Sequence, residues 1–247
     1  MRVLVVTSRV IKQIAKDHRF LALSVVGPLL ITYFLKLTID ALTPVGVSGR
    51  YDNLVMPVVA AIVFFLGYIL CLLALVRERT SQTLSRMFVS GFQRGEIILG
   101  YLFGFMGLAT IQAALAMTEA YYLFNLSYSH HTLAYLFLVI WLLAVVSLSL
   151  GILVSNAART EGQVVPFIPL VLLPSLFLSG IITNGVDKLP NWAQDVSYAL
   201  PLRYASDSIL SLVKGGSLGD IHGSLIGLLV YGLVLLSLAA LTLKDYE

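Results

Sequence analysis

Long apolar runs separated by short polar segments dominate the pattern of this chain of 247 residues. A transmembrane helix needs about 20 apolar residues to cross a hydrocarbon layer of about 30 Å. Six runs meet that length, at 20–42, 54–76, 97–124, 132–154, 164–182 and 221–243. The pattern therefore predicts an all-α membrane protein whose six transmembrane helices form a single domain over 1–247.

The first 19 residues follow a different pattern, with apolar side chains on one strip and basic side chains on another. At 3.6 residues per helical turn, the apolar residues near one face are Val3, Val6, Val10, Ile11 and Ile14. The basic side is formed by Arg9, Lys12, Lys16 and Arg19. This arrangement predicts an amphipathic interface helix over 1–19 that lies on the membrane surface.

Two segments between the runs are also expected to be helical. Residues 77–96 are polar and charged, but Leu84, Met87 and Phe88 lie at i, i+3 and i+4 and so share one helix face. Such a ridge suits a coupling helix held by a cytosolic partner, and a positively charged surface loop is the simpler alternative. Residues 183–220 are too apolar for a free loop, and their spacing favours two short helices, broken at Pro201, that re-enter the outer leaflet.

Composition excludes an ordinary soluble protein, because 58% of the residues are hydrophobic and only 12% are charged, against about 25% charged in soluble domains. Orientation follows from lysine and arginine, which concentrate in cytoplasmic segments. Eleven of these residues lie in the N-terminal segment, the second and fourth links and the C-terminus, and four lie in the other links. Both termini are therefore predicted to be cytoplasmic, with the loops 43–53, 125–131 and 183–220 facing outward.

Two ordered groups of short motifs carry a family resemblance. The first group is Glu78-Arg79-Thr80, then Thr83-Leu84, then Glu96-Ile97-Ile98-Leu99-Gly100. The second group is Arg159, Gln163, Pro169, Leu178-Ser179-Gly180, Leu189-Pro190 and Pro201-Leu202-Arg203-Tyr204. With the six spans and the N-terminal helix, they resemble the ABC-2 family of permease subunits of ATP-binding-cassette exporters. The chain departs from the family pattern at Ser85, at Ser90-Gly91 and at 181–184.

The resemblance implies a permease subunit that moves an amphipathic or hydrophobic substrate, such as a drug, toxin or lipid-like molecule, outward. The sequence has no GxxxxGK[ST] motif, so ATP and Mg²⁺ are expected on two copies of a separate cytosolic ABC ATPase, and the chain alone is not an enzyme. A second permease copy or homologue and the lipid of a bacterial or archaeal plasma membrane are the other expected partners, with no nucleic acid. The ATPase-coupling residues that the resemblance implies are Glu78, Arg79, Thr80, Thr83, Leu84, Arg86, Met87, Phe88, Arg94 and Glu96.

Polar, aromatic and motif residues of the spans are candidates for a substrate path or gate. Among them, the ionisable residues stand out because a charged group is costly in hydrocarbon and is often functional there. Lys36 and Glu119 both fall toward the outer leaflet, where they could face each other or each reach water separately. Helix–helix hydrogen bonding is the more common role for a residue such as Gln112. The candidates are Lys36, Phe64, Tyr68, Gln112, Glu119, Pro169, Leu178, Ser179, Gly180 and Pro201.

Three glycines in the third run, Gly100, Gly104 and Gly107, have a spacing typical of small-residue packing motifs. Such residues let another helix approach closely. We therefore expect a close helix contact along this part of the run.

Alternatives to drug export remain open at this stage. An exporter of lipids or lipid-linked glycans would share all of these features. A stand-alone membrane enzyme would need convergent acid, base or nucleophile groups, but the ionisable residues are scattered in sequence, so no catalytic residue or metal ligand is assigned. An immunity or binding protein would sequester its ligand without ATP.

Overall fold

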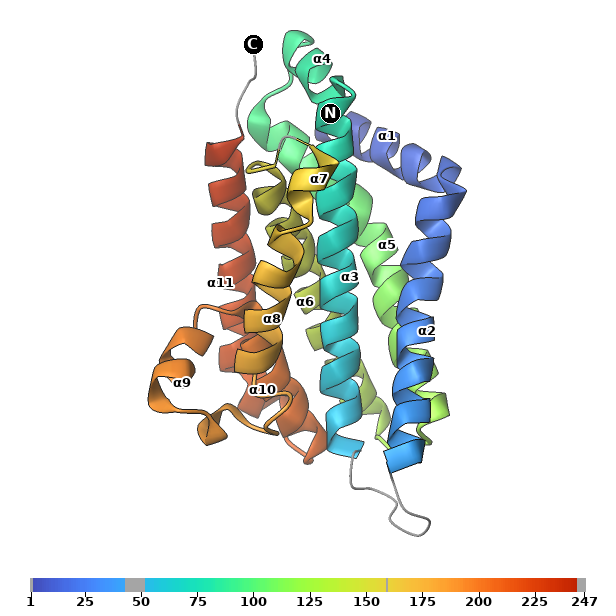
Figure 1. Cartoon of the computed structure of the whole chain (residues 1–247), viewed down its shortest axis with the longest axis vertical. Coiled ribbons are helices and arrows are strands. Elements are labelled where there is room, and N and C mark those ends of the chain that lie inside the picture. The colour runs from blue at the N-terminus through green and yellow to red at the C-terminus, as the bar shows by residue number, and fades with distance from the viewer. Residues whose placement is uncertain (1, 43–51, 159, 244–247) are drawn as a thin grey trace.

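The computed structural model describes residues 2–42, 52–158 and 160–243, and within them the regular structure is entirely helical (Figure 1). In this described part, six segments are long and apolar enough to cross a membrane. They are α2 (His18–Leu42), α3 (Asp52–Thr80), α5 (Arg94–Leu123), α6 (His130–Ser155), the pair α7 (Glu161–Val164) and α8 (Phe167–Leu178), and α11 (Leu218–Thr242). The predicted all-α fold with six spans is confirmed.

Helices α3 and α6 form the centre of the bundle. Most of the apolar part of α3 (72%) and of α6 (61%) is buried, whereas α2 (17%), α8 (11%) and α11 (22%) are largely open to their surroundings. Gly151 of α6 explains the close approach, because a Cβ atom there would lie 2.9 Å from the backbone oxygen of Tyr68 in α3. The core is therefore built on direct backbone packing between the second and fourth spans.

The N-terminal helix α1 (Arg2–Lys16) lies across one end of the bundle (Figure 1). Val6 and Val10 of α1 are buried on Gly100 and Gly104 of α5, where a Cβ atom would clash with them. The expected close packing is thus present at two of the three glycines, and its partner is α1. At Gly107, a Cβ atom would meet nothing within 4 Å.

A single residue, Asp17, joins α1 to α2. Its carboxylate oxygen Oδ1 accepts a hydrogen bond from the backbone N–H of Phe20 at 3.0 Å, so Asp17 caps the first turn of α2. Ile11, predicted on the apolar face of the N-terminal helix, is instead 49% exposed. The buried face is narrower than the sequence suggested because only the strip over α5 is covered.

The predicted coupling segment 77–96 consists of three pieces. Helix α3 continues to Thr80, the short helix α4 (Thr83–Val89) follows, and α5 begins at Arg94. Gln93 and Glu96 form a capping box that starts α5. The segment therefore contains a separate short helix between two helix ends.

The fifth span ends at Leu178, four residues before the predicted limit. Gly180 has φ of 78°, a left-handed conformation that ends helices and favours glycine. The chain then forms the 3₁₀ turn η1 (Val186–Lys188), α9 (Asn191–Ser197) and α10 (Pro201–Val213), and α10 packs against α6 and α11. Two short helices are present with the break between them just before Pro201, and their re-entry into the membrane stays a prediction.

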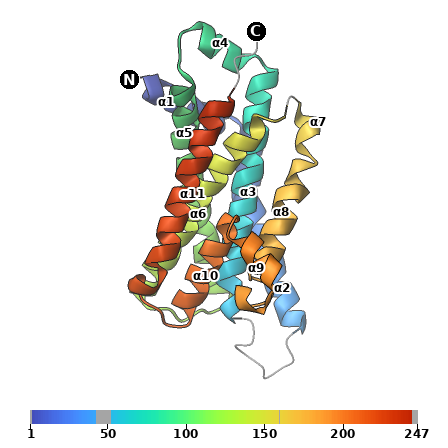
Figure 2. The ribbon, with the colours of Figure 1, turned by 90° about the vertical axis from the view of Figure 1, so that its left-hand side faces the viewer.

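Helix α1, helix α4 and the last turn of α11 share one end of the molecule, whereas α9, the end of α10 and the start of α11 lie toward the other (Figure 2). We call these the α4 end and the α9 end. Residues 43–51 of the predicted loop 43–53, Arg50 among them, lie outside the described residues, as do Arg159 and Lys244; residues 52 and 53 belong to α3.

Candidate functional site

A buried carboxylate near the end of α3 connects three helices at the α4 end. Glu78 is only 4% exposed, and its oxygen Oε2 accepts a hydrogen bond from Nη2 of Arg9 in α1 at 2.6 Å. Nη1 of Arg9 lies 3.1 Å from the sulfur of Met87 in α4. A buried charge needs such a partner, so this ion pair holds α1, α3 and α4 together.

The surroundings of Arg9 favour its protonated, charged form. Burial acts to lower the pKa of Arg9, but the adjacent Tyr101 and Glu78 outweigh it, so the pKa lies above its ordinary value. Tyr101 is a buried residue of α5. The ion pair therefore lies at the place where α1, α3, α4 and α5 meet.

The next residue, Arg79, points from a different face of α3, because neighbours on a helix are separated by about 100°. Its Nη1 donates to the backbone oxygens of Ser155 at 2.8 Å and Ala158 at 3.2 Å, and its Nη2 donates to Oδ1 of Asn156 at 3.0 Å. Ser155 is the last residue of α6. A guanidinium at a helix C-terminus satisfies free carbonyl groups and complements the helix dipole.

Asn156 extends this contact to the sixth span. Its Nδ2 donates to the backbone oxygen of Ala239 and to the hydroxyl of Thr242, both at 3.0 Å. Both residues belong to α11. Glu78 and Arg79 together thus connect α1 and α4 to α6 and α11, and we call Arg9, Glu78, Met87, Arg79 and Asn156 the junction.

The apolar ridge of α4 packs inward, which corrects the expectation that a cytosolic partner would hold it. Leu84 is 5% exposed and Met87 is 8% exposed, and Phe88 packs against the same core. Burial against the bundle removes this apolar surface from water without any partner. The outward face of α4 instead presents Arg86, Val89 and Ser90, with Val89 90% exposed.

The remaining predicted coupling residues make local contacts. The hydroxyl of Thr80 donates to the backbone oxygen of Arg77, and that of Thr83 lies 2.9 Å from the hydroxyl of Ser81. Glu96 accepts from the backbone N–H of Gln93 at 2.9 Å. Its carboxylate is also 3.8 Å from Arg2 of α1, while Arg94 is exposed.

The predicted substrate-path residues do not converge on one cavity. Phe64 and Tyr68 are fully buried in the core, and the Tyr68 hydroxyl donates to the backbone oxygen of Phe167, tying α3 to α8. Gln112 is buried and donates to the backbone oxygen of Ser24 in α2 at 2.9 Å, which is a helix–helix bond. The motif positions occupy separate places: Pro169 on the exposed side of α8, Leu178, Ser179 and Gly180 at its end, and Pro201 in the first turn of α10.

Lys36 pairs with Asp40 and not with Glu119. Its Nζ is 2.6 Å from Oδ1 of Asp40 and 5.5 Å from the centre of the Phe124 ring. In the described residues, Oε2 of Glu119 is buried without a hydrogen-bond partner. The two ionisable groups are therefore not a pair in this structure.

Arg203 organises the α9 end, although the sequence analysis gave it no site role. Its Nη1 donates to the backbone oxygen of Gln194 at 2.9 Å and to the Ser197 hydroxyl at 2.5 Å. The guanidinium also lies 3.6 Å from the centre of the Tyr198 ring and 3.5 Å from Asp207. Arg203 thereby fastens α9 to α10.

Arg9 and Asn156 also went unassigned in the sequence analysis. Their partners Glu78 and Arg79 are 69 and 77 positions away, so no local spacing connects them. The only available signal was the presence of basic residues in the N-terminal helix.

Within the described ranges, no group of three or more His, Cys, Asp or Glu residues could hold a metal ion.

Comparison with known proteins places these features in context. The model of the ABC-2 type transporter family matches residues 1–213. The chain is similar to "Probable multidrug ABC transporter permease YbhR" of Escherichia coli K12, with 27% identity over 183 residues, 73% of this chain and 49% of the relative. It is also similar to "Linearmycin resistance permease protein LnrN" of Bacillus subtilis, with 24% identity over 169 residues, 68% of this chain and 41% of the relative.

A third relative is "Nodulation protein J" of Neorhizobium galegae, with 31% identity over 157 residues, 63% of this chain and 58% of the relative. In these three comparisons the chain spans about half the length of the relative, between 41% and 58%.

Proposed function

Because the chain belongs to the ABC-2 type transporter family, we propose that it is the membrane permease subunit of an ATP-driven exporter. The family is one of multi-pass membrane transport subunits, and the six apolar spans agree with that role. The α4 end, with its nine described Lys and Arg residues at positions 2–19 and 77–94, is proposed to be cytoplasmic. The α9 end would then face outward.

The junction is the observation that carries this proposal. A cytosolic motor must move the spans through the short helices at its end of the bundle, and here α4 is joined to α1 by Arg9 and Met87. The Glu78–Arg9 pair and the Arg79–Asn156 bond continue that connection into α3, α6 and α11. A displacement of α4 would therefore be transmitted to several spans at once.

We place the ATPase contact on the outward face of α4. Val89 is 90% exposed, with exposed Arg86 and Ser90 beside it, whereas the ridge of Leu84 and Met87 is covered. Arg86 is of the residue type that often anchors protein interfaces, and Val89 beside it offers an apolar contact that a charge would disrupt. Two ATPase subunits, each carrying ATP and Mg²⁺, and a second permease copy or homologue would complete the transporter.

The proposed cargo is an amphipathic or hydrophobic molecule moved outward. Two relatives carry names that refer to multidrug transport and to linearmycin resistance, which supports a small amphiphile as the first candidate. Export of a lipid or lipid-linked glycan is the second candidate within the same family. A stand-alone membrane enzyme or an immunity protein is the competing class, and it would function without an ATPase.

The test is affinity purification of the tagged chain in mild detergent from its native membrane, followed by mass spectrometry and an ATP hydrolysis assay. Val89→Asp places a charge in the proposed contact. Val196→Asp in α9 is the matched control, because Val196 is also exposed, at 49%, but lies at the opposite end. Wild type and Val196→Asp should retain a P-loop ATPase, and Val89→Asp should retain at least 10-fold less of it, which corresponds to about 1.4 kcal/mol lost from the contact.

Two results would count against the proposal in different ways. If wild type retains no P-loop ATPase and hydrolyses no ATP, the permease function itself fails. If Val89→Asp retains as much ATPase as Val196→Asp, the permease function stands and the docking site lies elsewhere.

A further inference from the structure

A crevice of about 470 Å³ lies in the elbow between α1 and the bundle. It is bounded by α1, the first turns of α2, the last turns of α3, and α5. Its inner wall is apolar and includes Leu23, Leu70, Leu73, Ala74 and Phe105. Small-molecule sites commonly have volumes of about 300–1,000 Å³, so the crevice has the size of a ligand site.

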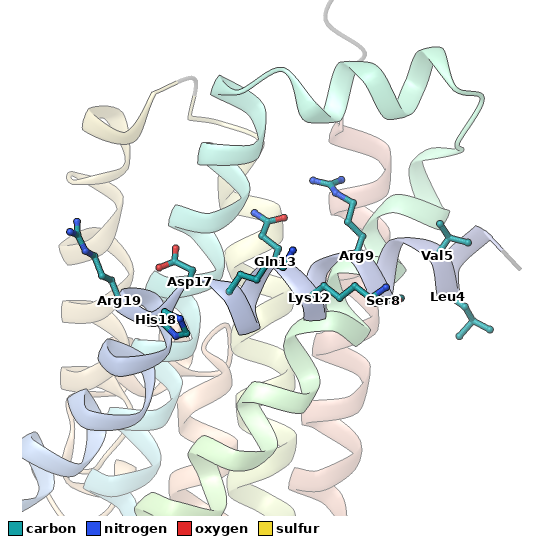
Figure 3. Close-up of a pocket in the computed structure, with 10 residues that line it drawn as sticks. Leu4, Val5, Ser8, Arg9, Lys12, Gln13, Asp17, His18 and Arg19 are labelled. Carbon is teal, nitrogen blue, oxygen red and sulfur yellow. The ribbon is translucent and has the colours of Figure 1, made fainter.

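The rim of the crevice is polar, with two arginines and one aspartate among its side chains. Gln13, Asp17, Arg19 and Arg77 lie at this rim. Figure 3, a close-up of the neighbouring groove along α1, shows Gln13, Asp17 and Arg19 projecting from the elbow in the same direction, toward the α4 end. One side of the hollow is thus charged and the other is apolar.

The two rim arginines differ in their partners. Arg77 is held by Asp17 at 3.6 Å and by Glu161 at 3.2 Å. The side chain of Arg19, among the residues that the structure describes, makes no ion pair or hydrogen bond. Its guanidinium is therefore available to an anion, and the exposed Lys12 and Lys16 line the outer groove of α1 together with Arg19.

The geometry points to an anionic phospholipid as the occupant: we propose that its phosphate binds at Arg19 and that an acyl chain enters the crevice beside Leu23 and Phe105. Basic pockets between transmembrane helices at a membrane surface bind anionic headgroups. Charge-assisted hydrogen bonds from a guanidinium to phosphate are strong and directional. The apolar wall explains why an intact lipid, and not free phosphate, is the ligand.

A bound lipid would stabilise the angle between α1 and α2. Asp17 is the only residue between α1 and α2, and Val10 both lines the crevice and packs on Gly104. A lipid seated here would contact α1, α2, α3 and α5 together and resist a change of angle at Asp17. This inference does not depend on the transported substrate or on an ATPase.

The experiment measures lipid adducts by native mass spectrometry after the chain is reconstituted with equal amounts of dioleoyl phosphatidylglycerol and dioleoyl phosphatidylcholine. Arg19→Gln removes the free cation, and Lys214→Gln, an exposed residue after α10, is its control. Leu23→Trp fills the crevice, and Leu30→Trp is its control, because Leu30 is also exposed, two turns further along α2, and does not line the crevice. A further sample receives glycerol 3-phosphate in place of lipid.

Wild type and both controls should favour phosphatidylglycerol over phosphatidylcholine by about 5-fold, the effect of one cation at a membrane surface. Arg19→Gln should lose that preference, Leu23→Trp should lose the tightly held adduct, and glycerol 3-phosphate should not bind. Any other pattern overturns the proposal: equal binding of the two lipids, a preference that survives either variant, or retention of glycerol 3-phosphate.

Discussion

The side-chain amide of Gln112 donates a hydrogen bond to the backbone oxygen of Ser24 over 2.9 Å. That oxygen is free because Pro28, four residues along α2, has no N–H to offer it. A side chain from α5 therefore completes the hydrogen bonding of α2 inside the bundle. In hydrocarbon, an unsatisfied backbone group would otherwise be costly.

Gln112→Leu should destabilise the chain by about 0.5–1.5 kcal/mol, because it leaves the Ser24 carbonyl buried without a donor. The same substitution should cost less in a Pro28→Ala background, where α2 supplies its own N–H. Cys71, the single cysteine, is buried, so a thiol-reactive fluorogenic dye reports the melting temperature. Equal losses in the two backgrounds would contradict this account of Pro28.

Gly104→Ala should loosen α1 from the bundle. An added Cβ would lie 2.5 Å from Cγ1 of Val10, and overpacking of this kind costs about 1–3 kcal/mol. Gly107→Ala is the matched control, because its added carbon meets nothing within 4 Å; it should be neutral or slightly stabilising. If α1 is loosened, proteolytic cleavage after residue 16 should become faster and the melting temperature reported by Cys71 should fall. Adding Val10→Ala to Gly104→Ala should partly reverse both changes.

Arg79→Lys should weaken the end of α6 although it conserves charge. Two nitrogens of the Arg79 fork reach three acceptors, two backbone oxygens and Oδ1 of Asn156, and a lysine ammonium cannot reproduce that geometry. The free energy of unfolding should fall by about 1.5–3 kcal/mol, and a lower melting temperature in the Cys71 dye assay would report that loss. Arg86→Lys, at an exposed residue with one long bond to the Ser81 oxygen, should have little effect.

The sequence predicted the spans because hydrophobic length is a property of one segment alone. It also predicted that Leu84, Met87 and Phe88 share a face, but spacing does not say what covers that face. The bundle itself covers it, so the expected orientation of α4 was wrong.

Long-range pairs were beyond local patterns. Arg9 and Glu78 are 69 residues apart, and only the packing of α1 on Gly100 and Gly104 brings them together. The Lys36–Asp40 pair was different, because its i, i+4 spacing is a recognised ion-pair spacing and was visible in the sequence.

The Arg9–Glu78 pair allows its effect on stability to be tested separately from its effect on transport coupling. Arg9→Gln leaves the carboxylate of Glu78 buried without its cation, which breaks a partly buried pair. Because the side chain of Arg9 is 36% exposed, we expect the free energy of unfolding to fall by about 1–3 kcal/mol, which is less than for a fully buried pair. The double variant Arg9→Gln/Glu78→Gln should recover part of that loss, since two neutral amides can hydrogen-bond where one charge was stranded.

Recovery of stability should not restore transport coupling if the pair transmits movement between α1 and α3. Under the proposed function, the double variant should retain the ATPase as wild type does, while substrate no longer stimulates ATP hydrolysis. Both readouts come from one purified sample, with the Cys71 melting temperature as the fold control. Substrate stimulation that returns together with stability would show that the pair only holds α1 in place, because then any contact of equal strength would serve.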